Sequence, residues 1–417
     1  MLNDREKSAR RKSWWTLAFL AAVLLAVPAS VNAGKKKNDT PPPQEEKSIL
    51  ERLDYSKIVW PNPPAITRIK YLDFFAAEKY VPQTKPKNAS GWMARMAGGA
   101  PDTKADFKPI FQLWTPYGLA VDSKGRIYVA DGKVGGIFIF NTETKDVEFI
   151  RNGLHARFGL IIGLAMDDND RLFVSDVKLR HILVFNKDHR VEATISEGMV
   201  DPGGMAIDTE NRFLYVADTG LDQVLVFDAD NYKLLRKIGT AGKDHTLTAP
   251  GEFSKPTNCA VDKDGNLYVA DTFNNRIEIF DADGNFISAF GKSGDGPGYF
   301  ARPKGVAVDV DGHIWVADAV QDRVQVFTKE GKLLIWMGGH GLLPGQFRDV
   351  AGLAIDKQNR VFTSEQFPGR VQMFRYVTQA EARAEYERRQ AMEQKPGESK
   401  TAVPAQDAAK AKEAAAR

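Results

Sequence analysis

Six acidic residues recur along the chain at similar intervals, and each closes a short apolar run. They are Asp131, Asp176, Asp218, Asp271, Asp318 and Glu365, separated by 45, 42, 53, 47 and 47 residues. Carboxylates in such numbers could act as acid–base catalysts or as oxygen ligands for a metal ion. A group that is present six times, however, cannot mark one asymmetric site. We therefore predict that these acids are structural and bond backbone amides where repeats join.

Histidine and cysteine offer little for the other common site chemistries. The six histidines are His155, His181, His189, His245, His313 and His340. A catalytic zinc ion needs about three convergent ligands, and none of these residues stands at the position before a first strand, where ligands would converge. The single Cys259 excludes an internal disulfide. The sequence therefore predicts no catalytic residue and no metal site. Calcium stays open as a cofactor, because Asn258, Asn274 and Glu365 could supply oxygen ligands.

The acids belong to a repeated pattern of short apolar runs. The clearest copy is Gly305–Phe327, and other copies begin at Gly118, Gly163, Gly204, Asn258 and Gly352. Runs rich in Val, Ile, Phe and Tyr alternate with turns such as Asp264-Gly265, which predicts strands and hairpins. Nine residues after each acid stands a phenylalanine, which we expect to pack between repeats: Phe140, Phe185, Phe227, Phe280, Phe327 and Phe374.

A fourth strand is predicted after five of the six copies, at residues 147–150, 191–195, 233–238, 285–290 and 332–337. Four-stranded units repeated at this period protect their edges and faces when they are arranged radially. We therefore predict an all-β fold, a six-bladed β-propeller of four-stranded antiparallel blades. The sixth copy has no fourth strand of its own, so we expect an N-terminal strand, Ile66–Phe75, to complete it and close the ring.

The repeats resemble those of the NHL family, in which Pro and a small residue precede an apolar run and Asn-Arg precedes the third strand. The fourth copy fits best, with Pro256, CAVD at 259–262 and LYVADTFNNRIEIF at 267–280. The resemblance covers residues 60 to 377 and implies a six-bladed propeller of the secreted bacterial type. NHL-type amidating lyases use channel histidines on zinc, which this chain does not match.

Antiparallel alternation places the segment before each first strand and the loop after each closing acid on one rim of the ring. Positions there that break the repeat are candidates for binding a ligand or partner. Lys and Arg outnumber Asp and Glu in these loops, which favours an anionic partner, although ordinary solvated loops would look the same. The candidates are Tyr117, Arg157, Lys178, Arg180, His181, Asn258, Asn274, Lys304 and Arg348.

Four segments lie outside the repeats. Residues 1–33 have a basic start, an apolar core and small residues for cleavage, as in a secretory signal peptide; an uncleaved anchor is the alternative. Residues 34–59 are expected to be a disordered linker. Residues 76–114 form an insertion between the closing strand and the first blade. Residues 378–417 are predicted to be a short helix followed by a low-complexity tail.

These features predict an exported, periplasmic or extracellular propeller that binds a protein or small ligand through one rim. The net charge of +3 gives no bulk attraction to nucleic acid or membrane, and no stable membrane span is expected after removal of the signal. One alternative is a calcium-dependent hydrolase or lyase with its site at the central channel mouth. Another is a structural subunit of an envelope complex, held through the C-terminal helix. The oligomeric state is left open.

Overall fold

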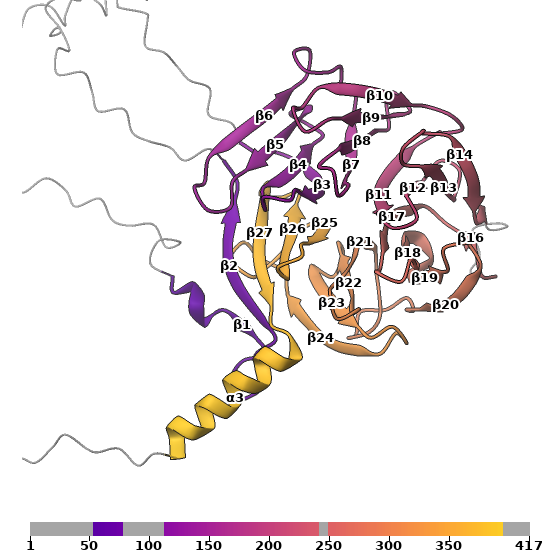
Figure 1. Ribbon diagram of the computed structural model, residues 1–417. Coiled ribbons are helices and arrows are strands. Elements are labelled where there is room, and N and C mark those ends of the chain that lie inside the picture. The colour runs from indigo at the N-terminus through magenta and orange to yellow at the C-terminus, as the bar shows by residue number, and fades with distance from the viewer. Residues whose placement is uncertain (1–52, 78–111, 242–248, 395–417) are drawn as a thin grey trace, which may run out of the picture. The chain divides into compact units, whose positions relative to one another are not determined.

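The computed structural model describes residues 53–77, 112–241 and 249–394, and all of them belong to one compact unit. Six antiparallel sheets are arranged as the blades of a ring (Figure 1). The innermost strand of each blade contacts the innermost strand of the next, and the last contacts the first. The predicted six-bladed β-propeller is confirmed.

The strands of blades one to three follow one another along the chain. Blade one contains β3 (Pro116–Val121), β4 (Ile127–Asp131), β5 (Gly136–Phe140) and β6 (Val147–Arg151). Blade two contains β7 (Ile161–Met166), β8 (Leu172–Asp176), β9 (His181–Phe185) and β10 (Val191–Ile195). Blade three contains β11 (Pro202–Asp208), β12 (Phe213–Asp218), β13 (Gln223–Asp228) and β14 (Leu234–Ile238).

Blades four to six are joined by longer connections. Blade four contains β17 (Pro256–Val261), β18 (Leu267–Asp271), β19 (Arg276–Phe280) and β20 (Phe286–Phe290). Blade five contains β21 (Pro303–Val308), β22 (Ile314–Asp318), β23 (Arg323–Phe327) and β24 (Leu333–Gly338). Blade six contains β25 (Val350–Ile355), β26 (Arg360–Glu365) and β27 (Arg370–Tyr376). The short strands β15 (Thr240–Ala241) and β16 (Glu252–Phe253) pair in the connection that precedes blade four.

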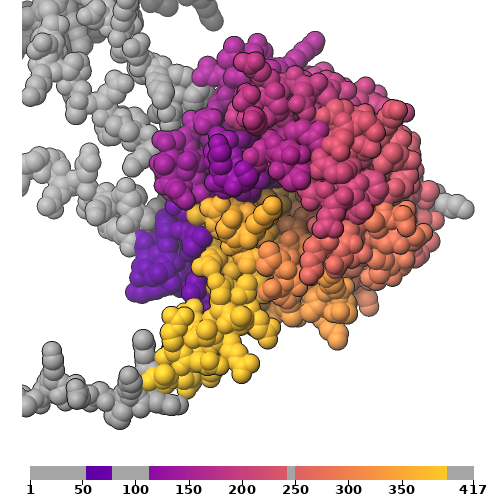
Figure 2. Space-filling view, viewed as in Figure 1, coloured from indigo at the N-terminus to yellow at the C-terminus, as the bar shows by residue number. Residues whose placement is uncertain are grey.

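The N-terminal strand β2 (Ile69–Phe75) completes blade six, as the sequence predicts. It pairs antiparallel with β27, with Ile69 opposite Tyr376 and Phe75 opposite Val371. Figure 2 shows the indigo N-terminal residues packed beside the yellow C-terminal ones at this seam. Two segments of the chain therefore close the ring by strand pairing.

Residues 53–59, which the sequence assigns to the linker, are part of the fold. They include a 3-10 turn, η1 (Tyr55–Lys57), and the start of β1 (Val59–Trp60), which pairs with β2 as a fifth strand. The rings of Tyr55 and Tyr71 make an edge contact with their centroids 5.1 Å apart. Apolar side chains that pack on blade six thus draw the end of the expected linker onto the sheet.

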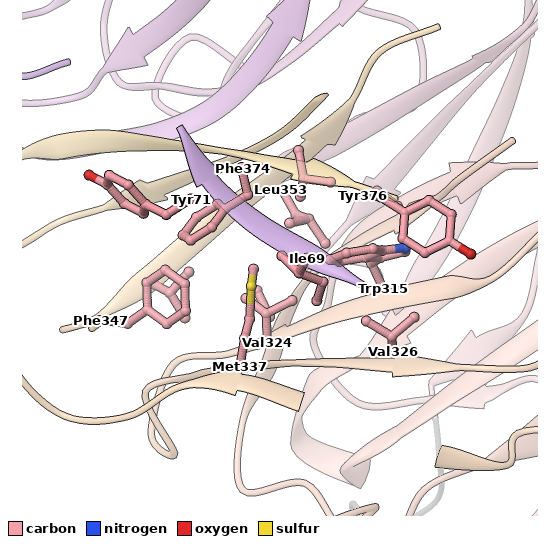
Figure 3. Close-up of a cluster of buried hydrophobic side chains, with 14 residues drawn as sticks. Ile69, Tyr71, Trp315, Val324, Val326, Met337, Phe347, Leu353, Phe374 and Tyr376 are labelled. Carbon is pink, nitrogen blue, oxygen red and sulfur yellow. The ribbon is translucent and has the colours of Figure 1, made fainter. Parts of the chain in front are cut away.

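The largest cluster of buried apolar side chains lies between blades five and six (Figure 3). Ile69 from the closing strand is fully buried there against Trp315, Met337 and Phe374. Burial of such side chains is the main favourable contribution to folding. Since the closing strand supplies part of this core, closing the ring also fills the interface between the last two blades.

The helix α3 (Gln379–Gln394) follows β27 directly, close to the predicted bounds. The Glu381 carboxylate accepts a hydrogen bond from the Thr378 backbone N–H, and the Thr378 hydroxyl accepts one from the Glu381 N–H, which is a capping box. Glu385 forms a 2.9 Å ion pair with Lys70 of β2. Among the described helices, none has the length and apolar character that crossing a bilayer requires.

Several predictions concern residues outside the described ranges. The signal peptide at 1–33, most of the linker, most of the 76–114 insertion and the tail after residue 394 are among them. The two described ends of the insertion are paired, because Ala77 and Gln112 form an antiparallel bridge and the Leu113 N–H donates to the Ala76 carbonyl. The insertion therefore leaves and re-enters the ring at one place.

Candidate functional site

We call one face of the propeller the upper rim. It is the face where each first strand begins and each second strand ends. The closing acids lie at this end of the blades, where their side chains are fully buried. Asp131 accepts hydrogen bonds from the backbone N–H groups of Trp114 and Thr115 at 2.6 and 3.0 Å, and from those of Lys133 and Val134 at 3.0 and 2.9 Å. The bonds therefore tie the segment that leads into a blade to a turn of the same blade.

Blades four and six reinforce this arrangement with an arginine. The Nε of Arg276 lies 2.8 Å from Asp271, and that of Arg370 lies 2.8 Å from Glu365. The Asn274 amide donates to Asp271 at 2.8 Å. Burial raises the pKa of both acids, and the hydrogen bonds and arginine charges partly offset this effect. These groups satisfy one another inside the blade, so Asn274 does not face the rim.

The central channel opens between the first halves of the innermost strands. Its mouth encloses a cavity of about 190 Å³, and three of the candidate residues, Tyr117, Asn258 and Lys304, line it. The structure thus brings together one candidate each from blades one, four and five.

Close packing around the channel depends on glycines. A Cβ atom on Gly352 would lie 2.2 Å from the Tyr117 carbonyl oxygen, which is far inside van der Waals contact. The Ser364 hydroxyl donates to the same carbonyl and accepts from the Gly352 N–H, and Ser175 bridges Gly163 and Gly203 in the same way. Backbone carbonyls therefore join neighbouring blades at the channel.

The remaining candidates are distributed around the upper rim. Arg157, Lys178 and Arg180 are exposed on blade two. His181 is half-buried at the start of β9, its Nε2 atom is buried without a hydrogen-bond partner, and burial lowers its pKa. Arg348 lies on blade six with its guanidinium 4.3 Å from the ring centroid of Phe367. The structure does not gather these five side chains into one cluster.

Sequence reasoning missed a second set of residues on the same face, the exposed aromatic side chains. Trp114 and Phe273 are each 56% exposed and Phe367 is 48% exposed. Each has a cation over its ring, with Lys133, Arg302 and Arg348 at 4.7, 5.2 and 4.3 Å from the respective centroids. Phe273, Val320 and Phe367 all stand two residues after a closing acid. The shared position of these three residues after a closing acid is the sequence feature that could have predicted their exposure.

Together with the 59%-exposed Val320, these side chains span the consecutive blades four, five, six and one. We call this set the rim arc. It consists of Trp114, Phe273, Val320 and Phe367 with the cations Lys133, Arg302 and Arg348. Exposed aromatic and arginine side chains are among the kinds of residue that protein interfaces use.

The geometry gives little support for a metal centre. In the part of the chain that the structure describes, no three His, Cys, Asp or Glu side chains are grouped to hold a metal ion. Asn258 faces the channel, whereas Asn274 and Glu365 are engaged inside blades four and six. Cys259 is buried, and burial raises the pKa of its thiol to about 12.

Comparison with known proteins supports the fold. A family model described as a 6-bladed beta-propeller matches residues 252–324. A structural genomics protein from Bacteroides thetaiotaomicron has a similar structure, with a TM-score of 0.52 and 15% identity; the match covers 63% of this chain and 70% of that one. At this identity the likeness concerns the fold alone.

Two Caenorhabditis elegans proteins share sequence with part of the chain. One is a probable peptidyl-alpha-hydroxyglycine alpha-amidating lyase, pgal-1, which is 38% identical over 92 residues, or 21% of this chain and 24% of its own. The other is protein lin-41, which is 49% identical over 51 residues, or 12% of this chain and 4% of its own. The chain thus spans a quarter or less of each relative. These similarities, with the closed ring of repeats, support one conclusion: the chain is a six-bladed β-propeller with NHL-type repeats.

Proposed function

We propose that this protein is an exported binding module that holds a protein partner through the rim arc. The partner would present apolar side chains together with acidic groups. The observation that carries the proposal is the placement of three exposed aromatic rings, each beside a cation, on blades four, six and one, with the exposed Val320 on blade five between them. The structure of the free chain gives these side chains no apolar contact large enough to bury them.

The composition of the rim arc supports this function. Aromatic and arginine side chains are enriched in protein interfaces, where large flat groups bury much area with few rotatable bonds. A cation beside each ring favours an acidic partner, since charge complementarity speeds association and selects against basic surfaces. The propeller is fixed by buried carboxylates and by strand pairing, so it would hold these side chains in place.

The partial similarity to a probable amidating lyase supports a second candidate, an enzyme with its site at the channel mouth. Metal analysis of the purified chain tests it. The binding function is favoured because the polar side chains that the structure describes in the channel lining, those of Tyr117, Thr257, Asn258, Cys259 and Lys304, do not form a set of metal ligands.

The location of the protein is part of the proposal. The basic start and apolar core of residues 1–33 support export across the inner membrane. A phosphatase reporter that is active only outside the cytoplasm, fused after residue 394, tests this. Reporter activity that is equal with and without residues 1–33 would argue against export.

Site-specific crosslinking tests the binding surface. A photoreactive amino acid replaces Phe273 or Phe367 in cells, and the crosslinked protein is identified by mass spectrometry. The matched control replaces Val310, which is 50% exposed in a turn between β21 and β22 on the opposite face. We expect one partner to be crosslinked from the rim arc and not from Val310.

The identified partner is then purified, and its affinity for the chain is measured. Phe273→Ala with Phe367→Ala should weaken binding at least tenfold, because both rings would be buried in the complex. Val310→Ala should leave the affinity unchanged. Equal crosslinking from both faces, or an affinity that survives the double substitution, would contradict the rim arc as the interface.

A further inference from the structure

The channel mouth holds a cation that the rim arc does not explain. Lys304 lies at the second position of β21 and lines the mouth together with Tyr117, Thr257 and Asn258. The other lining residues are glycines and apolar side chains, and no acidic side chain is among the described residues of this lining. Lys304 is therefore the one basic residue that the structure describes in this small, mainly apolar lining.

The side-chain ammonium of Lys304 has no hydrogen bond or ion pair with any other described residue. Burial lowers the pKa of its ammonium, and the nearby charge of Arg302 acts in the same direction. The charge of Asp349 opposes this shift without cancelling it. A partly buried ammonium without a partner costs folding free energy, so a ligand that supplies the missing negative charge would relieve that cost.

Two further donors at the mouth are uncommitted. The Asn258 Oδ1 accepts a 2.8 Å hydrogen bond from the Cys259 N–H, which leaves its amide nitrogen without an acceptor among the described residues. The Tyr117 hydroxyl likewise has no partner within the described ranges. The Thr257 hydroxyl, by contrast, bonds Thr272 and the Lys304 carbonyl oxygen. Three residues that carry hydrogen-bond donors, one of them charged, thus line a space whose described lining supplies no carboxylate.

We propose that the channel mouth binds the carboxylate of a short apolar acid, with Lys304 as the counter-ion and Asn258 and Tyr117 as hydrogen-bond donors. One positive charge matches one carboxylate better than it matches a doubly charged phosphate. The cavity of about 190 Å³ is smaller than sites for drug-sized ligands. Leu119, Leu164 and Leu353 in the lining suit a short apolar body.

The acid could be a free small molecule or the terminal carboxylate of a peptide, and calorimetry on the full chain distinguishes these sources. The free probe is N-acetyl-leucine, and its neutral control is N-acetyl-leucinamide. The peptide probe is a tetrapeptide that ends in leucine with a free carboxylate, and its control is the same peptide amidated. We expect each acid that binds to do so at least tenfold more tightly than its amide.

Binding of both acids indicates a site for free acids, and binding of the peptide alone indicates recognition of a chain end. Both results support the proposal. Acids and amides that bind equally, or the absence of binding by any probe up to 10 mM on the scale of weak ligands, would overturn it.

Lys304→Met should reduce the affinity for the acids at least tenfold, while Lys178→Met, which removes an exposed lysine from the same rim, should not change it. The melting temperature of Lys304→Met should equal or exceed that of the native chain, since the substitution removes a buried charge and keeps the volume. Retained binding by a folded Lys304→Met chain would refute the assignment.

This proposal does not depend on the rim arc. The double substitution Phe273→Ala with Phe367→Ala should leave the affinity for the carboxylate probes unchanged. Failure of partner binding and failure of acid binding can therefore be told apart.

Discussion

The carboxylate of Glu278 accepts a 2.8 Å hydrogen bond from the backbone N–H of Gly251. Glu278 is fully buried in β19, and the bond fixes the connection that leads into blade four. Glutamines make the same bond in the next two blades, from Gly298 to Gln325 at 2.7 Å and from Gly345 to Gln372 at 2.8 Å. Blade four therefore has an ionisable carboxyl at the position where blades five and six have a neutral amide.

We predict that Glu278→Gln stabilises the chain at alkaline pH. Burial raises the pKa of Glu278 from its ordinary value of 4.5 to about 7, although Arg276 opposes the shift. The folded state thus binds this proton more tightly than the unfolded state. The resulting stability is fully present below pH 4.5 and is lost as the pH rises through 7. The substitution should raise the unfolding free energy by about 1–3 kcal/mol at pH 8 and change it little at pH 5.

Urea denaturation at both pH values measures this effect. The reverse substitution, Gln325→Glu, is the matched control and should introduce a loss of stability between pH 5 and 8 in blade five. An equal effect of Glu278→Gln at the two pH values would mean that the carboxyl does not titrate in this range.

Closure of the ring makes a second prediction. Ile69 is fully buried between blades five and six, whereas Leu72 on the same strand is 36% exposed. Ile69→Ala should lower the unfolding free energy by about 2–5 kcal/mol because it leaves a cavity, and Leu72→Ala should lower it by less than about 1 kcal/mol. Chemical denaturation distinguishes the two, and similar losses would show that β2 does not seal the core.

The seam between blades six and one depends on a serine. Ser364→Ala would leave the Tyr117 carbonyl and the Gly352 N–H without their present partner. Loss of such buried bonds should cost about 1–3 kcal/mol. The control is Ser288→Ala, because Ser288 is half-buried on the outer strand β20 and has no side-chain hydrogen bond among the described residues. Thermal unfolding of both variants measures the difference, and equal melting temperatures would contradict the bridge.

Calcium analysis tests the enzyme alternative. Calcium takes six to eight oxygen ligands, and Asn274 and Glu365 already bond neighbours inside their own blades. We expect the chain, purified without chelators, to carry no stoichiometric calcium and to melt at the same temperature with and without added calcium. A stoichiometric ion, or a clear rise in melting temperature on adding calcium, would favour the calcium-dependent enzyme.

Much of the fold could be predicted from the sequence because each strand and turn is specified by residues that are close together in the chain. The blades repeat the same alternation of apolar runs with turns rich in Asp, Asn and Gly, and the strand predicted at residues 191–195 agrees with the structure to the residue. The absence of a fourth strand in the sixth repeat predicts that the N-terminal strand closes the ring. The structural part played by residues 53–59 was missed because it depends on contact with β2, which local patterning does not report.

The site was harder to predict because exposure and pairing are properties of the folded chain. A search for polar residues that break the repeat found Lys304 and Tyr117 at the channel, but it also selected Asn274, whose amide is engaged with Asp271. The same search passed over Phe273 and Phe367, since apolar residues in a loop normally indicate core. Their exposure follows from the short turn after each acid, which leaves the second residue no neighbour to cover it.

The pairing of β2 with β27 has a consequence for biosynthesis. Lys70 and Glu385 form an ion pair although 315 residues separate them. During synthesis β2 therefore lacks its partner strand β27 until nearly the whole propeller has left the ribosome. Blades one to five can assemble in order as they emerge, but the last one is completed only when translation of β27 is finished. A polypeptide released before that point would expose an unpaired sheet edge, which promotes aggregation and proteolysis.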